Sequence, residues 1–423
     1  MDKLIVSGGS TLQGSINISG SKNASLPILA ATILAEDPCI IRRVPDVSDT
    51  NYMIQILNQL GVHVERSSGT VRTNPENIIS EAPYDLVRKM RASICIMGPL
   101  LARTGRAKVS LPGGCVIGDR PIDLHIKGLE ALGAKVEMEG GDITLTAPEG
   151  GLVGATINMR GKNGPTVLGT DNVMMAATLA KGTTVIESAA CEPEVVDLAN
   201  FLNSLGAKIT GAGTRSITIE GVERLGGIEH HVIADRIEAG TYMVAGAMAS
   251  EGITLKRVSR PELKAVEEVL LEAGHVVEFD EEKNTVFVAP GKNPKGFQIV
   301  TEPYPGFPTD MQAQFSALAA VTPGISVIKD TIFPQRFMHC AEMKRMGADI
   351  QVDNGQAVIQ GGKPLSGAPV MASDLRASAA LVLAGLCAEG DTHISRLYHI
   401  DRGYENIDDK LEQLGADVQR VKE

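Results

Sequence analysis

The hydrophobic pattern of the chain repeats six times. In each repeat, apolar residues recur at helical spacing, a glycine follows, and apolar and polar residues then alternate. A glycine in this place is the usual left-handed end of a helix, and the alternation predicts a strand with one buried face. Successive glycines lie 68–73 residues apart, which defines the length of the repeat. The six segments are LNQLGVHVE, LEALGAKVE, LNSLGAKIT, LLEAGHVVE, MKRMGADIQ and LEQLGADVQ, with Gly61, Gly133, Gly206, Gly274, Gly347 and Gly415.

A second helix with a different composition recurs with the same period. It consists almost entirely of small and apolar residues, as in SLPILAATILA, NVMMAATLA and SAALVLAGL, and a short strand follows it. A helix that is apolar on every side is buried, whereas an amphipathic helix covers a core with one face. Each repeat therefore predicts one buried helix, one covering helix and strands between them. A third landmark, Leu-x-Gly opening a strand, occurs at Leu12, Leu152, Leu225 and Leu365.

The lengths of the chain and of its repeat limit the architecture. A chain of 423 residues is too long for one hydrophobic core, so two or three domains are expected. A repeat of about 70 residues is long for a solenoid and too helical for a propeller blade. The glycine-rich stretch ERLGGIEHHVIAD, at residues 223–235, is the best domain boundary and leaves about three repeats on each side. Two similar lobes predict a ligand-binding cleft between them.

Composition and charge exclude several classes of protein. The chain has 51 acidic and 40 basic residues and a net charge of −11, so no overall positive field attracts nucleic acid or anionic lipid. Its 6 Tyr and 8 Phe, with no Trp, are too few for a surface that stacks single-stranded nucleic acid. No apolar run reaches the roughly 18 residues of a membrane span, and the N-terminus lacks the apolar core of a signal peptide. An anionic ligand must therefore be held by a local cluster of cations.

The cysteines and histidines do not form metal motifs. The six cysteines are scattered without a Cys-x-x-Cys pair, which argues against a zinc ribbon or a thioredoxin motif. Free thiols in a reducing cytosol are expected, and hence a cytoplasmic protein. The eight histidines show no metal-ligand spacing. For His125, His339 and His399 the sequence leaves open whether each is a structural imidazole or a catalytic group.

A polar residue stands near the start of each predicted buried helix. Aspartate is a favoured helix cap, which explains the acidic members without any ligand. Lysine and arginine are different, because a cation at this place opposes the helix dipole by about 0.3–1 kcal/mol. An anion shared by the helix starts and the cations would explain this cost, since such sites bind phosphate groups. The residues are Lys22, Arg91, Asp171, Asp235 with Arg236, Asp310, and Arg376.

The loop SLPGGCVIGDRPIDLH is the most unusual stretch of the chain. Cys115 follows two glycines, and Asp119 and Arg120 follow closely. A single cysteine is more often a small buried residue. Flanking glycines nevertheless predict an exposed loop, and a neighbouring cation favours the thiolate. A reactive thiol is therefore the better hypothesis for Cys115.

Together these segments resemble the enolpyruvyl transferase family along essentially the whole chain. The resemblance rests on GSKNASLPILAA, APYDLVRKMRAS, LPGGCVIGDRPIDLH, ADRIEAGT, FPTDMQAQ, RFMH, SDLRASAALVLAG and YHIDRGYENIDDKL. It implies an α/β protein of two inside-out α/β barrel domains, made of six βαβαββ-type repeats, three per domain. It also implies one domain at residues 21–233, with the cysteine loop, and a second domain at residues 1–20 and 234–423, completed by the N-terminal strands.

The resemblance also implies the reaction. The enolpyruvyl group of phosphoenolpyruvate would move to the 3′-hydroxyl of UDP-N-acetylglucosamine with release of phosphate, the first committed step of peptidoglycan precursor synthesis. This step serves cell-wall biogenesis, and with it cell shape and cell division. The resemblance implies no metal or redox cofactor and no nucleic-acid or membrane partner. It also implies that the protein would be the target of fosfomycin. The sequence does not fix the oligomeric state, for which a monomer is favoured.

Site residues are carried over at the positions that match the family motifs. Asp310 would be the base, and Cys115 an acid or a covalent trap for phosphoenolpyruvate. Lys22, Arg120 and Arg402 would contact phosphoenolpyruvate and phosphate, with Arg91 and Arg376 in electrostatic support. Asn23 would contact the sugar. The uridine contacts would be Arg120, Pro121, Ile122, Asp123 and Leu124, and the far wall of the site would be formed by Ile332 and Phe333. The segment at residues 160–172 departs from the family by a few additional residues, and Lys162, Thr166 and Val167 are its counterparts of the uracil contacts.

Two other functions remain to be separated by experiment. A 5-enolpyruvylshikimate-3-phosphate synthase would share the fold, although a loop cysteine and GDRPIDLH are not its pattern. A non-catalytic UDP-sugar sensor would also keep the fold. Lys22, Cys115, Asp310 and Arg402 argue against such a sensor, because binding alone does not require both a thiol and a base.

Overall fold

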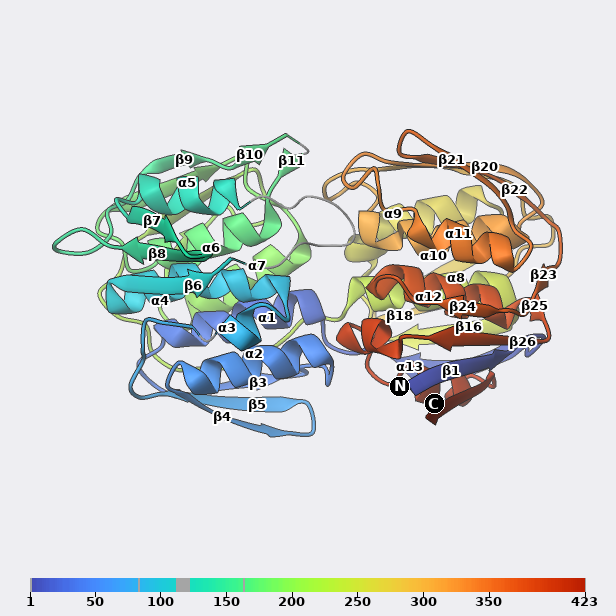
Figure 1. The fold of residues 1–423 in the computed structure, drawn as a ribbon, viewed down its shortest axis with the longest axis horizontal. Coiled ribbons are helices and arrows are strands. Elements are labelled where there is room, and N and C mark those ends of the chain that lie inside the picture. The colour runs from blue at the N-terminus through green and yellow to red at the C-terminus, as the bar shows by residue number, and fades with distance from the viewer. Residues whose placement is uncertain (1, 83, 112–121, 163, 423) are drawn as a thin grey trace. The chain divides into compact units, whose positions relative to one another are not determined.

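The computed structural model describes residues 2–82, 84–111, 122–162 and 164–422. They form two compact units (Figure 1). The C-terminal unit contains residues 2–19 and 234–422, and the N-terminal unit contains the described residues between 20 and 233. None of the helices in these ranges is long and apolar enough to cross a membrane.

The described part of the N-terminal unit contains three larger sheets. Their strand orders are β15-β3-β5-β4, β6-β8-β7 and β13-β14-β12-β9, and β10 with β11 forms a small hairpin. The strands are β3 (Cys39–Arg42), β4 (Val62–Ser67), β5 (Thr70–Pro75), β6 (Arg106–Ser110), β7 (Lys135–Glu139), β8 (Asp142–Thr146), β9 (Thr156–Asn158), β10 (Arg160–Gly161), β11 (Gly164–Pro165), β12 (Thr183–Glu187), β13 (Lys208–Thr210), β14 (Ser216–Glu220) and β15 (Glu229–His231). The helices are α1 (Lys22–Ala31), η1 (Thr32–Leu34), α2 (Ser48–Gln59), α3 (Tyr84–Val87), η2 (Arg91–Ile96), α4 (Met97–Thr104), α5 (Asp123–Ala131), α6 (Val167–Ala177) and α7 (Pro193–Ser204).

The described part of the C-terminal unit also contains three larger sheets. Their orders are β17-β18-β16-β2, β19-β20-β22-β21 and β24-β26-β1-β27, and β23 pairs with β25. The strands are β1 (Asp2–Ser7), β2 (Leu12–Asn17), β16 (Ser250–Lys256), β17 (Val276–Asp280), β18 (Thr285–Ala289), β19 (Gln298–Thr301), β20 (Gly324–Asp330), β21 (Asp349–Asp353), β22 (Gln356–Gly361), β23 (Leu365–Ser366), β24 (Pro369–Met371), β25 (Ala388–Glu389), β26 (Asp391–Ser395) and β27 (Asp417–Lys422). The helices are α8 (Arg236–Ala249), α9 (Arg260–Glu272), η3 (Thr309–Met311), α10 (Gln312–Val321), α11 (Met338–Arg345), α12 (Leu375–Leu386), η4 (Leu397–Arg402) and α13 (Ile407–Gln413).

One strand pattern recurs in five of the described sheets. The strand that follows the buried helix pairs in parallel with an edge strand on one side and antiparallel with an inner strand on the other, as β12 does with β9 and β14. In the sheet of β6, a single parallel bridge between Glu81 and Lys108 stands where the other sheets have their edge strand. The six repeats expected from the sequence are therefore confirmed at the level of strand pairing.

The two helix types behave as the sequence predicts. All residues of α12 from Arg376 to Leu386 are buried, whereas α9 buries only Leu263, Val266, Glu267 and Leu270. The helices rich in small residues, such as α6, form the interior of each unit. Strands such as β12 lie around them and alternate between buried and exposed positions. The described sheets stay open, and none of them closes on itself.

Glycines end the amphipathic helices in the predicted way. All six repeat glycines have φ between 91° and 110°, the left-handed region that only glycine adopts at little cost. Two of the Leu-x-Gly glycines, Gly154 and Gly367, have a different cause. At Gly154 a Cβ atom would lie 2.3 Å from the carbonyl oxygen of Thr183, and at Gly367 it would lie 2.4 Å from that of Asp391. Glycine is required there because the neighbouring strand approaches closely.

The N-terminal strands pair with the end of the chain. Strand β1 lies between β26 and β27, with Leu4 opposite both Ile394 and Arg420. In Figure 1 the blue ribbon of β1 accordingly lies among red strands. Strand β2 pairs in parallel with β16. The sheets of the C-terminal unit therefore need residues from both ends of the sequence.

A buried polar cluster fixes the point at which the chain leaves the C-terminal unit. Glu238 accepts a hydrogen bond from the backbone N–H of Ser19 at 3.0 Å and forms an ion pair with Lys410. The Ser19 hydroxyl accepts from Lys410 at 2.7 Å and donates to Glu405 at 2.6 Å. Burial raises the pKa of Glu238 to about 7, although the ion pair with Lys410 opposes this rise.

This cluster predicts that stability depends on pH. The pKa of Glu238 is near 4.5 in the unfolded chain and about 7 in the folded protein, so the folded protein binds this proton more tightly. The resulting stabilisation of the fold is fully present below pH 4.5 and is lost as pH rises through about 7. This loss corresponds to about 3 kcal/mol. Glu238→Gln is expected to flatten that part of the curve, as measured by urea unfolding between pH 4.5 and 8. Parallel pH curves for the variant and the wild type would contradict the prediction.

Candidate active site

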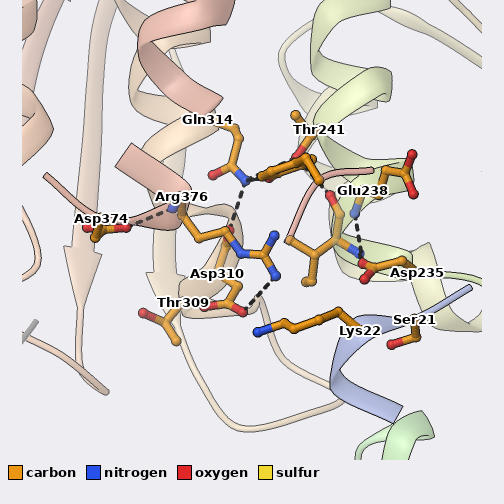
Figure 2. A network of polar contacts seen from close by, with 12 residues as sticks. Ser21, Lys22, Asp235, Glu238, Thr241, Thr309, Asp310, Gln314, Asp374 and Arg376 are labelled. Carbon is orange, nitrogen blue, oxygen red and sulfur yellow. Dashed lines mark hydrogen bonds and ion pairs between the residues drawn. The ribbon is translucent and has the colours of Figure 1, made fainter. Parts of the chain in front are cut away.

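Asp310 lies where two buried arginines meet in the C-terminal unit. Its Oδ1 atom accepts a hydrogen bond from Arg336 Nη1 at 2.7 Å, and its Oδ2 atom accepts one from Arg376 Nη2 at 3.3 Å. Figure 2 shows the contact with Arg376. The arginine side chains are 6% and 2% exposed, whereas Asp310 is 28% exposed. Of the three groups, the carboxylate therefore has the most access to a ligand.

Arg376 has unused capacity for hydrogen bonding. It lies in the first turn of α12, and its guanidinium group lies over the ring of Tyr404, 5.3 Å from the ring centre. Within the described residues, the buried Nε and Nη1 atoms of Arg376 have no hydrogen-bond partner. Leaving a buried charged donor unpaired is costly, so an anionic ligand would stabilise this arrangement.

Neutral side chains lock the helices around this pair. Gln314 of α10 donates to the backbone oxygen of Asp310 at 2.9 Å and to the hydroxyl oxygen of Thr241 in α8 at 3.1 Å. The Thr241 hydroxyl lies 2.9 Å from that of Tyr404. Figure 2 shows Gln314 and Thr241 above Asp310. Helices α8 and α10 and the segment after η4 are thereby held in one arrangement.

The loop after β20 is held by one carboxylate. Asp330, which is 2% exposed, accepts hydrogen bonds from the hydroxyls of Thr301 and Thr309 at 2.8 and 2.7 Å. It also accepts from the backbone N–H groups of Ile332 and Phe333 at 2.9 and 2.8 Å. Ile332 and Phe333, which the sequence analysis expects at the far wall of the site, are therefore anchored to the start of η3. The sequence analysis missed Asp330, although its position at the end of a predicted strand was a usable signal.

Lys22 opens α1 in the N-terminal unit. Its Nζ atom lies 3.6 Å from Oδ2 of Asp49, and Ser21 caps the helix by accepting a hydrogen bond from the N–H of Ala24 at 3.2 Å. Part of the charge of this cation is therefore balanced by Asp49, which the sequence analysis missed. Asn23 is the next helical residue and is half-buried.

Arg91 opens η2 and lies near the start of α5. Burial, with the positive charge of Arg91, lowers the pKa of His125 to about 4. Nδ1 of His125 accepts a hydrogen bond from the side-chain amide of Asn172 at 2.8 Å, and the same amide donates to the carbonyl of Ile94 at 2.9 Å. His125 is therefore a neutral structural imidazole.

The expectation that Asp171 stands at a helix start is wrong. Helix α6 begins at Val167, and Thr166 caps it by accepting a hydrogen bond from the N–H of Gly169 at 3.2 Å. Asp171 lies inside the helix, where burial and the negative charge of Glu192 raise its pKa well above the ordinary range. The apolar residues that precede Asp171 are already helical, so the helix starts earlier than the polar residues suggest.

The expected nucleotide contacts lie on two segments that touch. Ile122 and Asp123 stand at the start of α5, and the side chain of Leu124 packs so closely on Gly161 that a Cβ atom there would lie 3.0 Å from it. Lys162 is exposed in the turn between β10 and β11. The start of α5 and this hairpin are therefore neighbours. The predicted roles of Cys115, Arg120 and Pro121 lie outside the described residues.

The remaining expected groups, Arg402, His399 and Asp235, lie in the C-terminal unit. Arg402 is the last residue of η4 and is half-buried. Burial, with the charge of Arg402, lowers the pKa of His399. Asp235 caps α8, as expected, by accepting hydrogen bonds from the N–H groups of Ile237 and Glu238. In the ranges that the structure describes, no group of three His, Cys, Asp or Glu side chains could hold a metal ion.

Comparison with known proteins identifies the family. The model of the EPSP synthase (3-phosphoshikimate 1-carboxyvinyltransferase) family matches residues 6–411. The chain belongs to the EPSP synthase family. This EPSP synthase family member is 66% identical over 421 residues to a UDP-N-acetylglucosamine 1-carboxyvinyltransferase of Akkermansia muciniphila, with 100% of the chain and 99% of the relative covered. It is 58% identical over 421 residues, with the same coverage, to a protein of that name from Methylacidiphilum infernorum.

Solved structures of the EPSP synthase family confirm the fold class. The enolpyruvyl transferase NikO from Streptomyces tendae superposes with a TM-score of 0.88 at 25% identity, with 99% of each chain covered. An EPSP synthase from Acinetobacter baumannii gives a TM-score of 0.76 at 18% identity, with 100% of each chain covered, and supports the fold alone. The expected enolpyruvyl transferase fold is thus confirmed.

Proposed function

We propose that this protein transfers the enolpyruvyl group of phosphoenolpyruvate to the 3′-hydroxyl of UDP-N-acetylglucosamine and releases phosphate. The observation that carries the proposal is the 66% and 58% identity, over the full chain, to two proteins named for that activity. The reaction would commit UDP-N-acetylglucosamine to peptidoglycan precursor synthesis.

The chemistry assigns one task to each group of site residues. The sugar hydroxyl must lose a proton, and the methylene carbon of phosphoenolpyruvate must gain one. In the proposal, Asp310 accepts the hydroxyl proton and Cys115 protonates or covalently traps phosphoenolpyruvate. What supports the role of Asp310 is its partly exposed carboxylate between Arg336 and Arg376.

Cations would hold the charged groups of both substrates. Lys22, Arg120 and Arg402 would bind the carboxylate and phosphate of phosphoenolpyruvate, with Arg91 and Arg376 in electrostatic support. The unpartnered Nε and Nη1 atoms of Arg376 support this assignment. The nucleotide contacts would be Asn23 at the sugar, Pro121, Ile122, Asp123 and Leu124 with Arg120 at the uridine, Lys162, Thr166 and Val167 at the uracil, and Ile332 and Phe333 at the far wall.

We further propose that the protein acts in the cytoplasm as a monomer and needs no cofactor. The five cysteines in the described ranges are all free thiols, which supports a reducing compartment.

Phosphate release tests the proposed reaction. With phosphoenolpyruvate and UDP-N-acetylglucosamine, the protein is expected to release one phosphate per enolpyruvyl-sugar nucleotide formed, as followed by a phosphate assay and by mass spectrometry. The matched reaction contains shikimate 3-phosphate, because the EPSP synthase family is named for transfer to that acceptor. Turnover of shikimate 3-phosphate alone would replace the proposal with the sibling activity. Binding of UDP-N-acetylglucosamine without phosphate release would identify a sensor.

A further inference from the structure

Arg420, on β27, connects the two ends of the segment between η4 and α13. Its Nη1 and Nη2 atoms donate to Oδ2 and Oδ1 of Asp401 at 3.1 and 2.9 Å, and its Nε atom donates to Oδ2 of Asp408 at 2.8 Å. Asp401 lies in η4, and Asp408 lies in the first turn of α13. One guanidinium group therefore fixes residues 401–408 at both ends.

This contact differs from an ordinary surface ion pair. Exposed pairs contribute little, but a two-point bond between a planar guanidinium group and a carboxylate fixes the orientation of both groups. The side chains of Arg420, Asp401 and Asp408 are 29%, 33% and 15% exposed, so water reaches them only in part. The backbone of Arg420 is held in β27, where it lies opposite Leu4 of β1. The cation is therefore attached to a sheet and not to a loop.

Because of the geometry of η4, this contact also constrains Arg402. A 3₁₀ helix has three residues per turn, so side chains three residues apart lie on one face. Leu397 and Ile400 form one face of η4 and are buried in the core. Asp401 lies on the second face, which Arg420 holds, and Arg402 lies on the third. With two of its three faces fixed, η4 cannot turn about its axis, and the direction of Arg402 is set.

His399 indicates what the third face of η4 approaches. It precedes Arg402 by three residues and therefore shares its face. Burial and the charge of Arg402 lower the pKa of His399, whereas the charge of Asp374 opposes this shift. Asp374 caps α12 and accepts a hydrogen bond from the N–H of Arg376 at 2.7 Å. The face that carries Arg402 is thus directed towards the start of α12.

We propose that Arg420 is a positioning residue that holds η4 through Asp401 and thereby directs Arg402 towards phosphoenolpyruvate. This inference rests on the proposed function, in which Arg402 binds the carboxylate or phosphate of phosphoenolpyruvate. Arg420 makes no contact with the substrate and acts only through Asp401. Without Arg420, η4 would keep its buried face but could turn about its axis, so Arg402 would spend part of its time away from the anion.

Two substitutions separate positioning from simple electrostatics. Arg420→Gln removes a positive charge, whereas Asp401→Ala removes a negative charge. Loss of a cation weakens the attraction for anionic phosphoenolpyruvate and loss of an anion strengthens it, so electrostatics alone predicts opposite effects. Positioning predicts the same effect in both variants, a fall of about 10- to 100-fold in kcat/KM for phosphoenolpyruvate. An Asp401→Ala variant with an unchanged or higher kcat/KM would overturn the inference.

The second substrate gives a readout that a purely structural role would not spare. KM for UDP-N-acetylglucosamine is expected to stay within about threefold of the wild type in both variants, because only the contact to phosphoenolpyruvate is misplaced. Equal losses for the two substrates would overturn the inference. Lys422→Gln is the control, because Lys422 is exposed on the same strand, and its kcat/KM should stay within about twofold.

Further variants test whether Arg420 and Asp401 act through one contact. In the double variant Arg420→Gln/Asp401→Ala, kcat/KM is expected to be at most about threefold below that of the weaker single variant, since residues in direct contact are not additive. Arg420→Lys keeps the charge but loses the two-point geometry, so we expect a kcat/KM between those of Arg420→Gln and the wild type. Multiplied effects in the double variant, or a fully active Arg420→Lys, would overturn the inference.

Hydrogen exchange separates this inference from the proposed function, because it requires no activity. In Arg420→Gln, the backbone amides of residues 397–408 are expected to exchange faster, with the rest of the C-terminal unit unchanged. Lys422→Gln should exchange like the wild type. A wild type that releases no phosphate would refute the proposed function. Unchanged exchange at residues 397–408, or faster exchange throughout the unit, would refute the role of Arg420.

Discussion

Replacing Asp310 by asparagine is expected to lower kcat for phosphate release by about 10²- to 10⁴-fold, the usual effect of losing a proton-transfer group. The amide has nearly the same shape, and its oxygen can still accept the hydrogen bond that Arg336 donates to Oδ1. It cannot take up the hydroxyl proton. Steady-state phosphate release measures kcat, and calorimetry with UDP-N-acetylglucosamine measures binding, which should change little.

Asp349→Asn is the matched control for this prediction. Asp349 lies in the same unit, where its carboxylate is paired with Lys363 at 3.0 Å on the surface. Its loss should leave kcat within about twofold of the wild type, since surface ion pairs contribute little. If Asp310→Asn retained a third or more of the wild-type kcat, Asp310 would not be the base.

Replacing Phe315 by alanine is expected to destabilise the C-terminal unit by about 3–5 kcal/mol, because the core around a deleted phenyl ring collapses only in part. Phe315 is fully buried in α10 and packs edge-on against Phe307 and Phe297, with ring centres 5.0 and 5.8 Å apart. Urea unfolding followed by circular dichroism measures the loss. Where the two units unfold in separate transitions, only that of the C-terminal unit should move.

Phe279→Ala provides the comparison for the buried ring. Phe279 is half-buried in β17, where Arg260 lies over its ring at 5.6 Å. Truncating this side chain removes less buried surface and leaves a site open to water, so the loss should be clearly smaller. Equal losses in the two variants would show that the interior around α10 is not tightly packed.

Local patterns in the sequence predicted the elements well and their partners poorly. The buried and covering helices and the six left-handed glycines follow from spacing and composition within each repeat, which is where the physical cause lies. Strand pairing depends on distant segments. Nothing in the spacing of residues 2–7 indicates that Leu4 lies opposite Arg420, and only the family resemblance implied that these strands return.

The same limit applies to the site. Lys22 and Arg376 could be singled out because a cation at a helix start is unfavourable without a counter-charge. Arg336 acts from a loop, where no periodicity distinguishes a functional side chain from a solvated one. Asp330 is the last residue of β20, and that signal was not used. Asp171 shows the opposite error, since a polar residue that looks like a cap lies inside a buried helix.

The pairing of β1 also bears on how the protein is made. Ser7 pairs with Asp417 and Asp2 pairs with Lys422, so β1 must wait for residues 417–422 to be synthesised. At about 5–20 residues per second, this delay is on the order of tens of seconds. Until β26 and β27 have been made, residues 2–7 lack the two strands that flank them in the folded unit. The C-terminal unit can therefore complete this sheet only after β27 has been synthesised.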